Sequence, residues 1–276
     1  MDDMTPLITR VAGQVMSVNS YLVDTGAGVV VVDAQLCVSD ARTVRVAVDA
    51  TGKPLLAVLV THPHPDHYAG AATLTAALDV PLVSTAAVAA VIARDDAEKD
   101  RIVGPMMGEE WPTKRSFPDT LVEDGQTLRY GDIDVTVSSW GPGESHADTV
   151  WAVGDALFVG DLVYHDEHAY LADGHGSEWL ESLTRLEARL TEATTLYVGH
   201  GAPGGVGLVA AQRTYVETFL RAVEDALDLD PAEGERLVLE AIRPLAGNDG
   251  LLFLAQLSIE PTIAMLRHAE DRSSAS

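Results

Sequence analysis

Four side chains that can bind metal ions lie within six consecutive positions of this chain: His62, His64, Asp66 and His67. Imidazole nitrogens and carboxylate oxygens are ligands for zinc, and also for iron and manganese. A single histidine is more often a structural residue that is satisfied by hydrogen bonds. The density of this cluster, directly after an apolar run and before a helical stretch, instead predicts a metal site.

The spacing of the cluster indicates how its side chains point. A proline follows each of the first two histidines and disfavours helical backbone there, so that His62 and His64 are held extended. Residues two apart in an extended chain point the same way, which places both imidazoles and Asp66 on one side of the loop. Asp66 can begin the next helix, and the turn there aims His67 away. This geometry suits two neighbouring sites: one for His62 and His64, and another for Asp66 and His67.

Further ligands must come from distant parts of the chain, and three candidates stand at the ends of apolar runs. His146 lies in the Gly/Pro-rich segment GPGESHADT, after the apolar run VTVSSW. Asp161 ends the run ALFVGD, and His200 ends the run TLYVGH. Each residue alone fits a turn, a helix cap or a surface histidine. Together with the cluster at 62–67 they predict one composite site, because a scaffold presents functional groups where its strands end.

The pattern of apolar runs predicts the elements that carry these side chains. Residues 97–119, with three prolines, interrupt the pattern and fit either a lid or a loop held on the surface by its aromatic residues. The order of elements indicates an α/β protein with two sheets rather than one doubly wound sheet. Strands are expected near 15–23, 28–34, 55–60, 81–85, 120–124, 126–130, 132–140, 149–153, 156–160 and 195–199, and helices near 39–50, 69–78, 86–96, 179–190, 206–229, 232–242 and 250–268.

The composition limits the class of protein. The 276 residues suffice for one large domain and carry a formal net charge of −24, which repels nucleic acid and anionic membranes. Cys37 is the only cysteine, so no internal disulfide forms, and no apolar segment reaches the ~20 residues of a membrane-spanning helix. The acidic N-terminus lacks the apolar core of a signal peptide. We therefore expect a soluble, cytoplasmic protein with no nucleic-acid partner and no membrane partner.

The run HPHPDH at 62–67, followed by His146, Asp161 and the GHG at 199–201, resembles the metallo-β-lactamase fold superfamily. Within it, the residues are similar to the dinuclear metallo-hydrolases of the glyoxalase II and lactonase kind. The resemblance implies an αββα sandwich with the metals at the shared edge of two sheets. We expect a metallo-β-lactamase-like domain over 1–204 and a helical C-terminal extension over 205–276 that packs on it.

The resemblance also implies a ligand set and a cofactor. The cofactor is a pair of zinc ions, with iron and manganese left open. Many relatives carry Gly-His-Thr at the third ligand, whereas this chain has Ser145-His146-Ala147, which keeps the implied ligand but changes its surroundings. By match to the motif, one metal takes His62, His64 and His146, the other takes Asp66, His67 and His200, and Asp161 bridges them.

Such a centre implies metal-assisted hydrolysis. Two divalent ions carry four positive charges, and Asp66, Asp161 and one bridging hydroxide carry three negative charges, which leaves about +1 to hold a developing oxyanion. The hydroxide attacks the carbonyl of an ester, lactone, thioester or lactam, and Asp66 is the catalytic residue that orients it. The alternative is a mononuclear iron-dependent sulfur dioxygenase, similar to persulfide dioxygenases, on the side of His62, His64 and Asp161.

The substrate side of the site is less specified. His165 or His168 is a candidate for facing the substrate, with Tyr164 or Tyr170 as an oxyanion donor. The same tract also fits a polar loop that faces solvent, and His-rich tracts bind adventitious metal. Trp111, which has methionine and phenylalanine neighbours, suggests an apolar acyl or aromatic substrate. We expect a small-molecule substrate, and a homodimer stays open.

Overall fold

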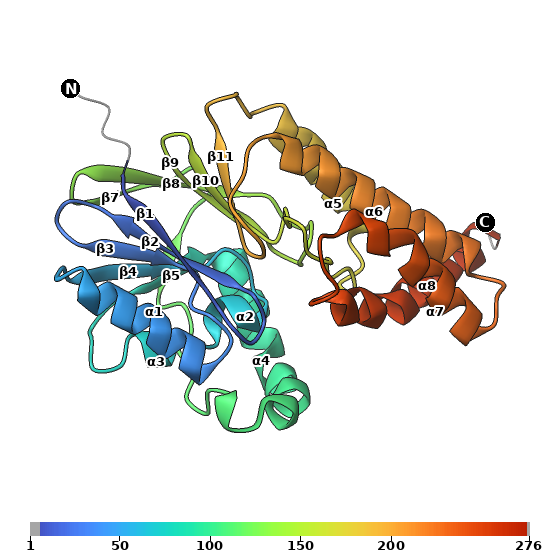
Figure 1. Cartoon of the computed structure of the whole chain (residues 1–276), viewed down its shortest axis with the longest axis horizontal. Coiled ribbons are helices and arrows are strands. Elements are labelled where there is room, and N and C mark those ends of the chain that lie inside the picture. Colours follow the sequence, from blue (N-terminus) through green and yellow to red (C-terminus); the bar gives the residue numbers. More distant parts are fainter. Residues whose placement is uncertain (1–5, 275–276) are drawn as a thin grey trace.

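The computed structural model describes residues 6–274, and over this range the chain forms two β-sheets that face each other between layers of helices (Figure 1). The strand order is β1-β2-β3-β4-β5-β6 in the first sheet and β11-β10-β9-β8-β7 in the second. The first sheet consists of β1 (Ile8–Ala12), β2 (Asn19–Asp24), β3 (Val29–Val32), β4 (Leu55–Leu59), β5 (Leu82–Thr85) and β6 (Thr120–Val122). The second consists of β7 (Thr127–Tyr130), β8 (Ile133–Ser139), β9 (Thr149–Val153), β10 (Ala156–Gly160) and β11 (Thr195–Val198).

Each sheet changes from antiparallel to parallel pairing along its width. In the first sheet, β1, β2 and β3 pair antiparallel, whereas β3, β4, β5 and β6 pair parallel. In the second, β7 to β10 pair antiparallel and β10 pairs parallel with β11. Parallel neighbours end at the same edge of a sheet, so the residues that follow β10 and β11 lie side by side.

The two sheets pack against each other through a layer of apolar side chains. Val32 and Leu59 of the first sheet and Val137 and Phe158 of the second all belong to this layer, and each is at most 1% exposed. The four valines of β3 are buried on both faces of their strand, because the other face is covered by helices. This explains why the run reads as continuous valine rather than as an alternation of apolar and polar residues.

Helices cover the outer face of each sheet. In chain order they are α1 (Val38–Ala50), α2 (Pro65–Tyr68), α3 (Ala71–Leu74), α4 (Ala86–Met107), α5 (Gly176–Glu187), α6 (Gly207–Asp225), α7 (Pro231–Ile242) and α8 (Leu252–Ser274). The first sheet is covered by α1, α3 and α4 through Val44, Leu74 and Ile92. The second sheet is covered by α5 and α6 through Leu183 and Val216. This confirms the predicted αββα sandwich.

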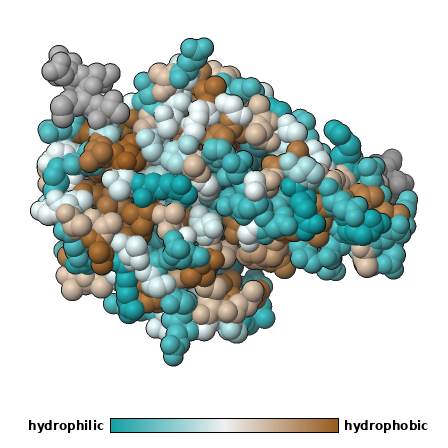
Figure 2. Space-filling model, in the orientation of Figure 1, coloured by the Kyte–Doolittle hydropathy of each residue, from teal (hydrophilic) through white to brown (hydrophobic). Residues whose placement is uncertain are grey.

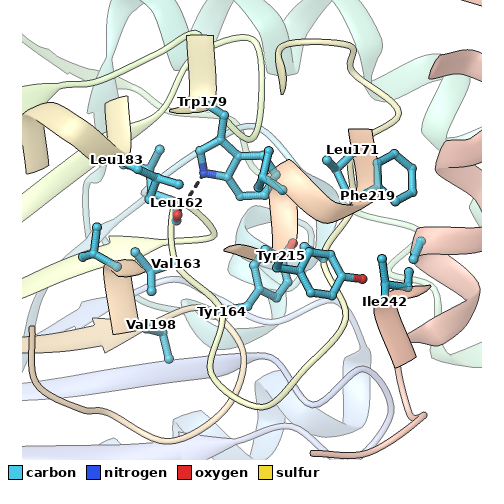
Figure 3. Packing of buried hydrophobic residues seen from close by; sticks show 14 of the residues in the cluster. Leu162, Val163, Tyr164, Leu171, Trp179, Leu183, Val198, Tyr215, Phe219 and Ile242 are labelled. Carbon is cyan, nitrogen blue, oxygen red and sulfur yellow. Dashed lines mark hydrogen bonds between the residues drawn. The ribbon is translucent and has the colours of Figure 1, made fainter. Parts of the chain in front are cut away.

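The C-terminal helices α7 and α8 pack on α6, at the end of the molecule away from β1 and β7 (Figure 1). Phe219 of α6 lies beside Leu171 of the loop before α5, and Ile242 of α7 belongs to the same cluster (Figure 3). Trp179 of α5 is anchored in this cluster by its indole N–H, which donates to the carbonyl of Leu162 over 2.9 Å. The helical C-terminal part is therefore present as expected, and the division of the chain at residue 204 stays a prediction.

The C-terminal helices also fix the loop between β10 and α5, residues 161–175. The backbone N–H of Leu171 donates to the hydroxyl of Ser258 in α8 over 2.8 Å. The side chain of His168 is fully buried, and its Nδ1 lies 3.0 Å from the hydroxyl of Tyr215 in α6. Buried polar contacts of this kind hold a loop in one conformation, because breaking them leaves unsatisfied groups away from water.

Several elements differ from the sequence-based expectation. The helix expected over 69–78 is limited to α3, Ala71–Leu74. The helix expected over 86–96 continues to Met107, so the expectation of a loop is wrong over 97–107. Pro105 stands near the end of α4, where its missing N–H removes one hydrogen bond and leaves the preceding turns intact. The edge strand β1 was not predicted, because its five residues are partly exposed and show no continuous apolar run. Over its whole length, Ile8 to Ala12, β1 nevertheless pairs in antiparallel register with residues 19–23 of β2.

The visible surface is mixed in hydropathy. Hydrophilic residues are spread over the visible face, with apolar residues interspersed among them (Figure 2). Among residues 6–274, no helix combines the length and the apolar character that crossing a membrane requires.

Candidate metal centre

Strand ends from both sheets present the predicted ligands. In the first sheet, β4 runs into the loop and the short helix α2 that together carry residues 62–67. In the second sheet, Asp161 directly follows β10, and His200 follows β11 after one glycine. An isolated bridge between Val18 and His200 joins the two sheets at this edge. Segments that are far apart in the sequence therefore meet at one place.

Asp66, His67, Asp161 and His200 form one buried group whose ligand atoms point at one another. His67 Nε2 lies 3.4 Å from Asp161 Oδ1 and 3.6 Å from Asp66 Oδ2. His200 Nε2 lies 3.2 Å from Asp66 Oδ2 and 3.3 Å from Asp161 Oδ2. The structure thus brings together four of the predicted residues, with separations that allow one cation to contact all of them.

A second buried group consists of His62, His64 and Glu144. Glu144 Oε2 lies 3.1 Å from His64 Nδ1 and 3.6 Å from His62 Nε2. Asp161 adjoins this group as well, because its Oδ2 lies 3.9 Å from His62 Nε2. Asp161 therefore stands between the two groups, as the predicted bridging role requires.

His146 is the one predicted ligand that the structure does not bring to either group. Its Nδ1 lies 2.6 Å from His175 Nε2, its Nε2 lies 3.7 Å from Asp173 Oδ2, and its side chain is 35% exposed. Glu144, two residues earlier in the same loop, stands beside His62 and His64 instead. Glu144 was not predicted as a ligand, because a carboxylate in a Gly/Pro-rich turn has an ordinary explanation as a turn residue. The only signal was its place in the loop that was already expected to supply the third ligand.

Several buried polar atoms of the two groups lack a hydrogen-bond partner within the described part of the chain, as expected of atoms that bind a cation. His62 Nε2, His67 Nε2, Glu144 Oε2 and Asp161 Oδ1 are buried and have no hydrogen-bond partner among the described residues. A buried polar atom without a partner is costly, and an unpaired buried carboxylate costs more. Two imidazole nitrogens and two carboxylate oxygens that face one another in this way match the donors of a zinc, iron or manganese centre.

Outer hydrogen bonds determine which ring nitrogens are free to bind a cation. His67 donates from Nδ1 to Asp33 Oδ2 over 2.7 Å, which leaves Nε2 with its lone pair. Thr61 donates its hydroxyl to the same oxygen over 2.8 Å and accepts from His62 Nδ1 over 3.1 Å. His64 is held in the opposite sense, because its Nε2 faces Asp173 at 3.3 Å and its Nδ1 faces the site. Such outer partners are typical of histidines that ligate metals.

The electrostatic field of the site favours positive charge. Burial by itself lowers the pKa of a histidine, yet Asp161 and Asp66 outweigh it and raise the pKa of His200 to about 10. The same two carboxylates raise the pKa of His67 well above its usual value against the effect of burial. Burial raises the pKa of Glu144 to about 8, although His64 opposes this. Where the protein by itself attracts protons so strongly, divalent cations are favoured for the same reason.

Two glycines leave the space that the ligands occupy. A Cβ atom on Gly199 would stand 1.8 Å from Asp161 Oδ1 and 2.9 Å from His67 Cε1. Gly160, at the end of β10, has φ +52°, and a Cβ there would stand 2.6 Å from Thr61 Oγ1. Glycine is the only residue that allows these backbones to approach the ligands so closely.

The two tyrosines near the centre have different surroundings. Tyr164 is buried, and its hydroxyl donates to Asp161 Oδ2 over 2.6 Å, with Glu144 Oε1 at 3.3 Å. It therefore orients two carboxylates of the centre rather than standing free as an oxyanion donor. Tyr170 lies edge-on to His64, with ring centroids 5.2 Å apart, and its side chain is only partly buried. A role of Tyr170 toward a substrate stays a prediction.

The residues predicted with least support to contact substrate have structural partners and lie in neither ligand group. His165 Nδ1 pairs with the carbonyl of Ala202 over 2.6 Å, which fixes the loop after His200. His168 is buried against α6, as described above. Trp111 packs in a small cluster with Leu36, Cys37 and Ala69, and its indole N–H donates to Asp100 over 2.7 Å. A role of these residues in substrate binding stays a prediction.

Comparison with known proteins identifies the family. The model of the metallo-beta-lactamase superfamily matches residues 13–200, which include all of the strands after β1 and both ligand groups. This chain belongs to the metallo-β-lactamase superfamily. The predicted resemblance is therefore confirmed. The superfamily match ends at His200, before the C-terminal helices begin.

Two curated relatives carry the same name. The chain is 31% identical over 161 residues to a hydroxyacylglutathione hydrolase of Alkalilimnicola ehrlichii, which covers 58% of this chain and 53% of that protein. It is 29% identical over 177 residues to a hydroxyacylglutathione hydrolase of a Shewanella species, which covers 64% of this chain and 58% of that protein. The chain thus spans just over half of the length of these metallo-β-lactamase superfamily relatives.

Solved structures agree with the metallo-β-lactamase fold. A β-lactamase domain protein from Burkholderia ambifaria superposes with a TM-score of 0.67 at 20% identity, over 98% of this chain and 91% of that one. A metallo-β-lactamase from Pontibacter korlensis superposes with a TM-score of 0.62 at 19% identity, over 77% of this chain and 93% of that one. At these identities the likeness concerns the fold alone. The first of them also extends over the C-terminal helices, since it covers nearly the whole chain.

Proposed function

We propose that this protein is a dinuclear metal-dependent hydrolase. Its substrate is a derivative of a small carboxylic acid: an ester, lactone, thioester or lactam. The observation that carries the proposal is the pair of buried ligand groups on either side of Asp161, with unpartnered donor atoms in both. Two divalent cations, with zinc as the first expectation, would supply Lewis acidity and a water molecule of lowered pKa. The name hydrolase in both curated relatives supports the same class of reaction.

Asp66 is the carboxylate of the centre that is best placed to act on a substrate. Its side chain is 13% exposed, whereas that of Asp161 is 3% exposed and that of Glu144 is fully buried. Its Oδ2 faces the imidazoles of His67 and His200, which fixes the orientation of the carboxylate. Asp66 can therefore orient the attacking water.

The charges around the centre bear on the choice among substrates. Two arginines of the C-terminal part are engaged with carboxylates: Arg213 with Glu187 at 2.9 Å, and Arg243 with Asp249 at 3.2 Å. Together with the net charge of −24, this disfavours substrates with several negative charges. We therefore rank neutral lactones and esters ahead of the glutathione thioester that the names of the relatives suggest. Nucleic acid is disfavoured as a partner for the same reason.

A mononuclear iron-dependent sulfur dioxygenase is the second candidate. The observation that favours it is the donor set of the group formed by His62, His64 and Glu144, because two imidazoles and one carboxylate are typical of non-haem iron oxygenases. The group of Asp66, His67, Asp161 and His200 disfavours this candidate. A single iron at His62 and His64 would leave buried atoms such as His67 Nε2 without a partner.

Metal content and turnover together test the proposal. Protein purified without added metal and without a histidine tag should hold about two metal equivalents per chain by elemental mass spectrometry, and it should hydrolyse members of a panel of lactones, esters, thioesters and β-lactams. His62→Ala should lose one equivalent and the turnover of every substrate found. About one iron, little zinc and oxygen consumption with a persulfide substrate would support the second candidate. Turnover by His62→Ala with full metal content would contradict the site.

A further inference from the structure

We infer that Glu144, and not His146, completes the metal site of His62 and His64, and that this carboxylate shifts the site toward a harder divalent cation such as Mn²⁺ or Fe²⁺. The inference depends on the proposed function, because it concerns one half of the proposed dinuclear centre. It assigns a ligand that the family motif does not supply, and with it a difference in metal preference between the two halves.

The contacts of Glu144 are those of a ligand. Its Oε2 is buried, has no hydrogen-bond partner among the described residues, and faces His64 Nδ1 at 3.1 Å and His62 Nε2 at 3.6 Å. His62 Nε2 is itself unpartnered, because the proton of that ring lies on Nδ1 toward Thr61. An acceptor oxygen and an acceptor nitrogen that face each other are satisfied by a cation between them.

The loop is built to present Glu144 inward. Ser145 donates from its backbone N–H and its hydroxyl to Asp148, over 3.2 Å and 2.9 Å, which closes the turn. The backbone N–H of Thr149 donates to the carbonyl of Thr61 over 2.9 Å, so this loop is fastened to the segment that carries the first two histidines. Tyr164 contacts only Oε1 of the glutamate at 3.3 Å, which leaves Oε2 for an ion.

His146 is directed to His175 and Asp173 rather than to His62 and His64. Its imidazole is engaged with His175 at 2.6 Å and lies edge-on to it, with ring centroids 4.7 Å apart. Glu144, two residues earlier, instead faces His62 and His64.

A carboxylate in place of an imidazole changes both the hardness and the charge of the site. Oxygen donors suit manganese and iron(II) relative to zinc better than imidazole nitrogens do. With Glu144 the centre contains three carboxylates, counting Asp66 and Asp161, against the four positive charges of two divalent ions. The extra negative charge also weakens the electron-withdrawing effect of the ion held by His62 and His64. That ion would thus bind firmly while activating its ligands less.

The test compares four proteins: the wild type, Glu144→Gln, Glu144→His and His146→Gln. Each is stripped with a chelator, reloaded with Zn²⁺ alone, Mn²⁺ alone or an equimolar mixture, and desalted. Metal per chain is counted by elemental mass spectrometry, and cobalt-loaded samples are compared by visible absorption. We expect two equivalents for the wild type and for His146→Gln, and about one for Glu144→Gln. Glu144→His should hold two, with its Mn²⁺ to Zn²⁺ ratio from the mixture reduced at least about tenfold.

The outcomes separate the two proposals. Two equivalents in Glu144→Gln together with one in His146→Gln would overturn the inference and leave the dinuclear hydrolase intact. A wild type that holds no metal after reloading would overturn both. An unchanged Mn²⁺ to Zn²⁺ ratio in Glu144→His would overturn the claim on metal preference. The metal retained by Glu144→Gln at the other half of the centre, and the two ions of Glu144→His, show that these variants fold.

Discussion

Asp33 lies outside both ligand groups, yet it determines how two histidines present their nitrogens. Its carboxylate accepts hydrogen bonds from His67 and from the backbone and hydroxyl of Thr61. Asp33→Asn replaces one acceptor oxygen by a donor amide and removes the preference for the His67 tautomer with a free Nε2. We expect metal affinity to fall by about 10- to 100-fold, measured by competition with a chromophoric chelator.

The matched control for this change is Asp134→Asn, which alters the same chemical group at the surface. Asp134 is 61% exposed and pairs only with Arg129. The metal affinity of Asp134→Asn should equal that of the wild type within error. Equal losses in both variants would show that the effect is a general one of charge, and the role assigned to Asp33 would then be wrong.

Gly199 gives a second test at the scale of one residue. An added methyl group would collide with Asp161 and the ring of His67, so Gly199→Ala must displace one ligand or the strand end. We expect loss of at least one metal equivalent and about 1–3 kcal/mol of destabilisation in urea unfolding. Gly205→Ala is the control, because nothing lies within 4 Å of a Cβ at that position and it should retain both properties. Full metal binding by Gly199→Ala would show that the strand end is more adaptable than the structure indicates.

The residues of the centre were predictable to different degrees. The alternation of histidine and proline at 62–65 fixes backbone and direction locally, so the spacing alone indicates a site there. Asp161 and His200 could be found because each ends a recognisable strand. The choice between Glu144 and His146 could not be made from the sequence, because it depends on how the turn closes on Asp148. That closure involves hydrogen bonds that no periodicity reports.

Among the elements, α4 is joined through Asp96 to the segment after it by an ion pair with Arg115, and to α2 by a hydrogen bond from Tyr68. Arg115 donates to both oxygens of Asp96 in α4 at 2.6 and 2.8 Å, and Tyr68 of α2 donates to Asp96 over 2.9 Å. Arg115→Ala leaves the carboxylate of Asp96 buried without its cation, and we expect a loss of about 2–4 kcal/mol in urea unfolding. Because α2 carries two ligands, metal release should also become faster.

Arg101→Ala is the control for this prediction, since Arg101 belongs to α4 as well but forms an exposed pair with Glu98. Exposed pairs contribute little, so its stability should stay within about 0.5 kcal/mol of the wild type. If both arginine variants lose the same small amount, the segment after α4 is not held in the way described here.

The elements themselves were mostly predictable from periodicity, and the exceptions have physical reasons. β3 and β4 are short, almost entirely apolar runs because they are buried on both faces, and α6 shows the spacing of a helix with one buried side. α4 was cut short in the prediction because proline and charges are read as helix ends, whereas here Pro105 falls in the last turn. β1 depends on its partner β2, which is a tertiary effect that a local pattern cannot show.

For the whole molecule, the centre makes stability depend on pH when metal is absent. Burial raises the pKa of Glu144 from 4.5 in the unfolded chain to about 8, and that of Asp148 from 3.8 to about 7. The folded state therefore binds more protons than the unfolded state in these windows, and stability falls as pH rises through them. We expect metal-free protein to lose on the order of a few kcal/mol between about pH 4.5 and 8. Urea unfolding in the presence of a chelator measures this.

Glu144→Gln should flatten the same profile, because the amide does not titrate. Metal should reverse the trend, since cations bind best to deprotonated ligands. Parallel profiles of the metal-free wild type and the variant would show that Glu144 does not carry the pH dependence.

The loop of residues 161–175 has a consequence for how such a protein changes over evolutionary time. This loop begins with the bridging carboxylate and includes Tyr170 and Asp173 beside His64, yet its conformation is set by Tyr215 and Ser258 on helices outside the superfamily match. Substitutions in those helices can change the conformation of this loop while the residues of both ligand groups stay unchanged. We therefore expect the helices and the loop to change together in evolution. A transplant of substrate preference between relatives must move both pieces together.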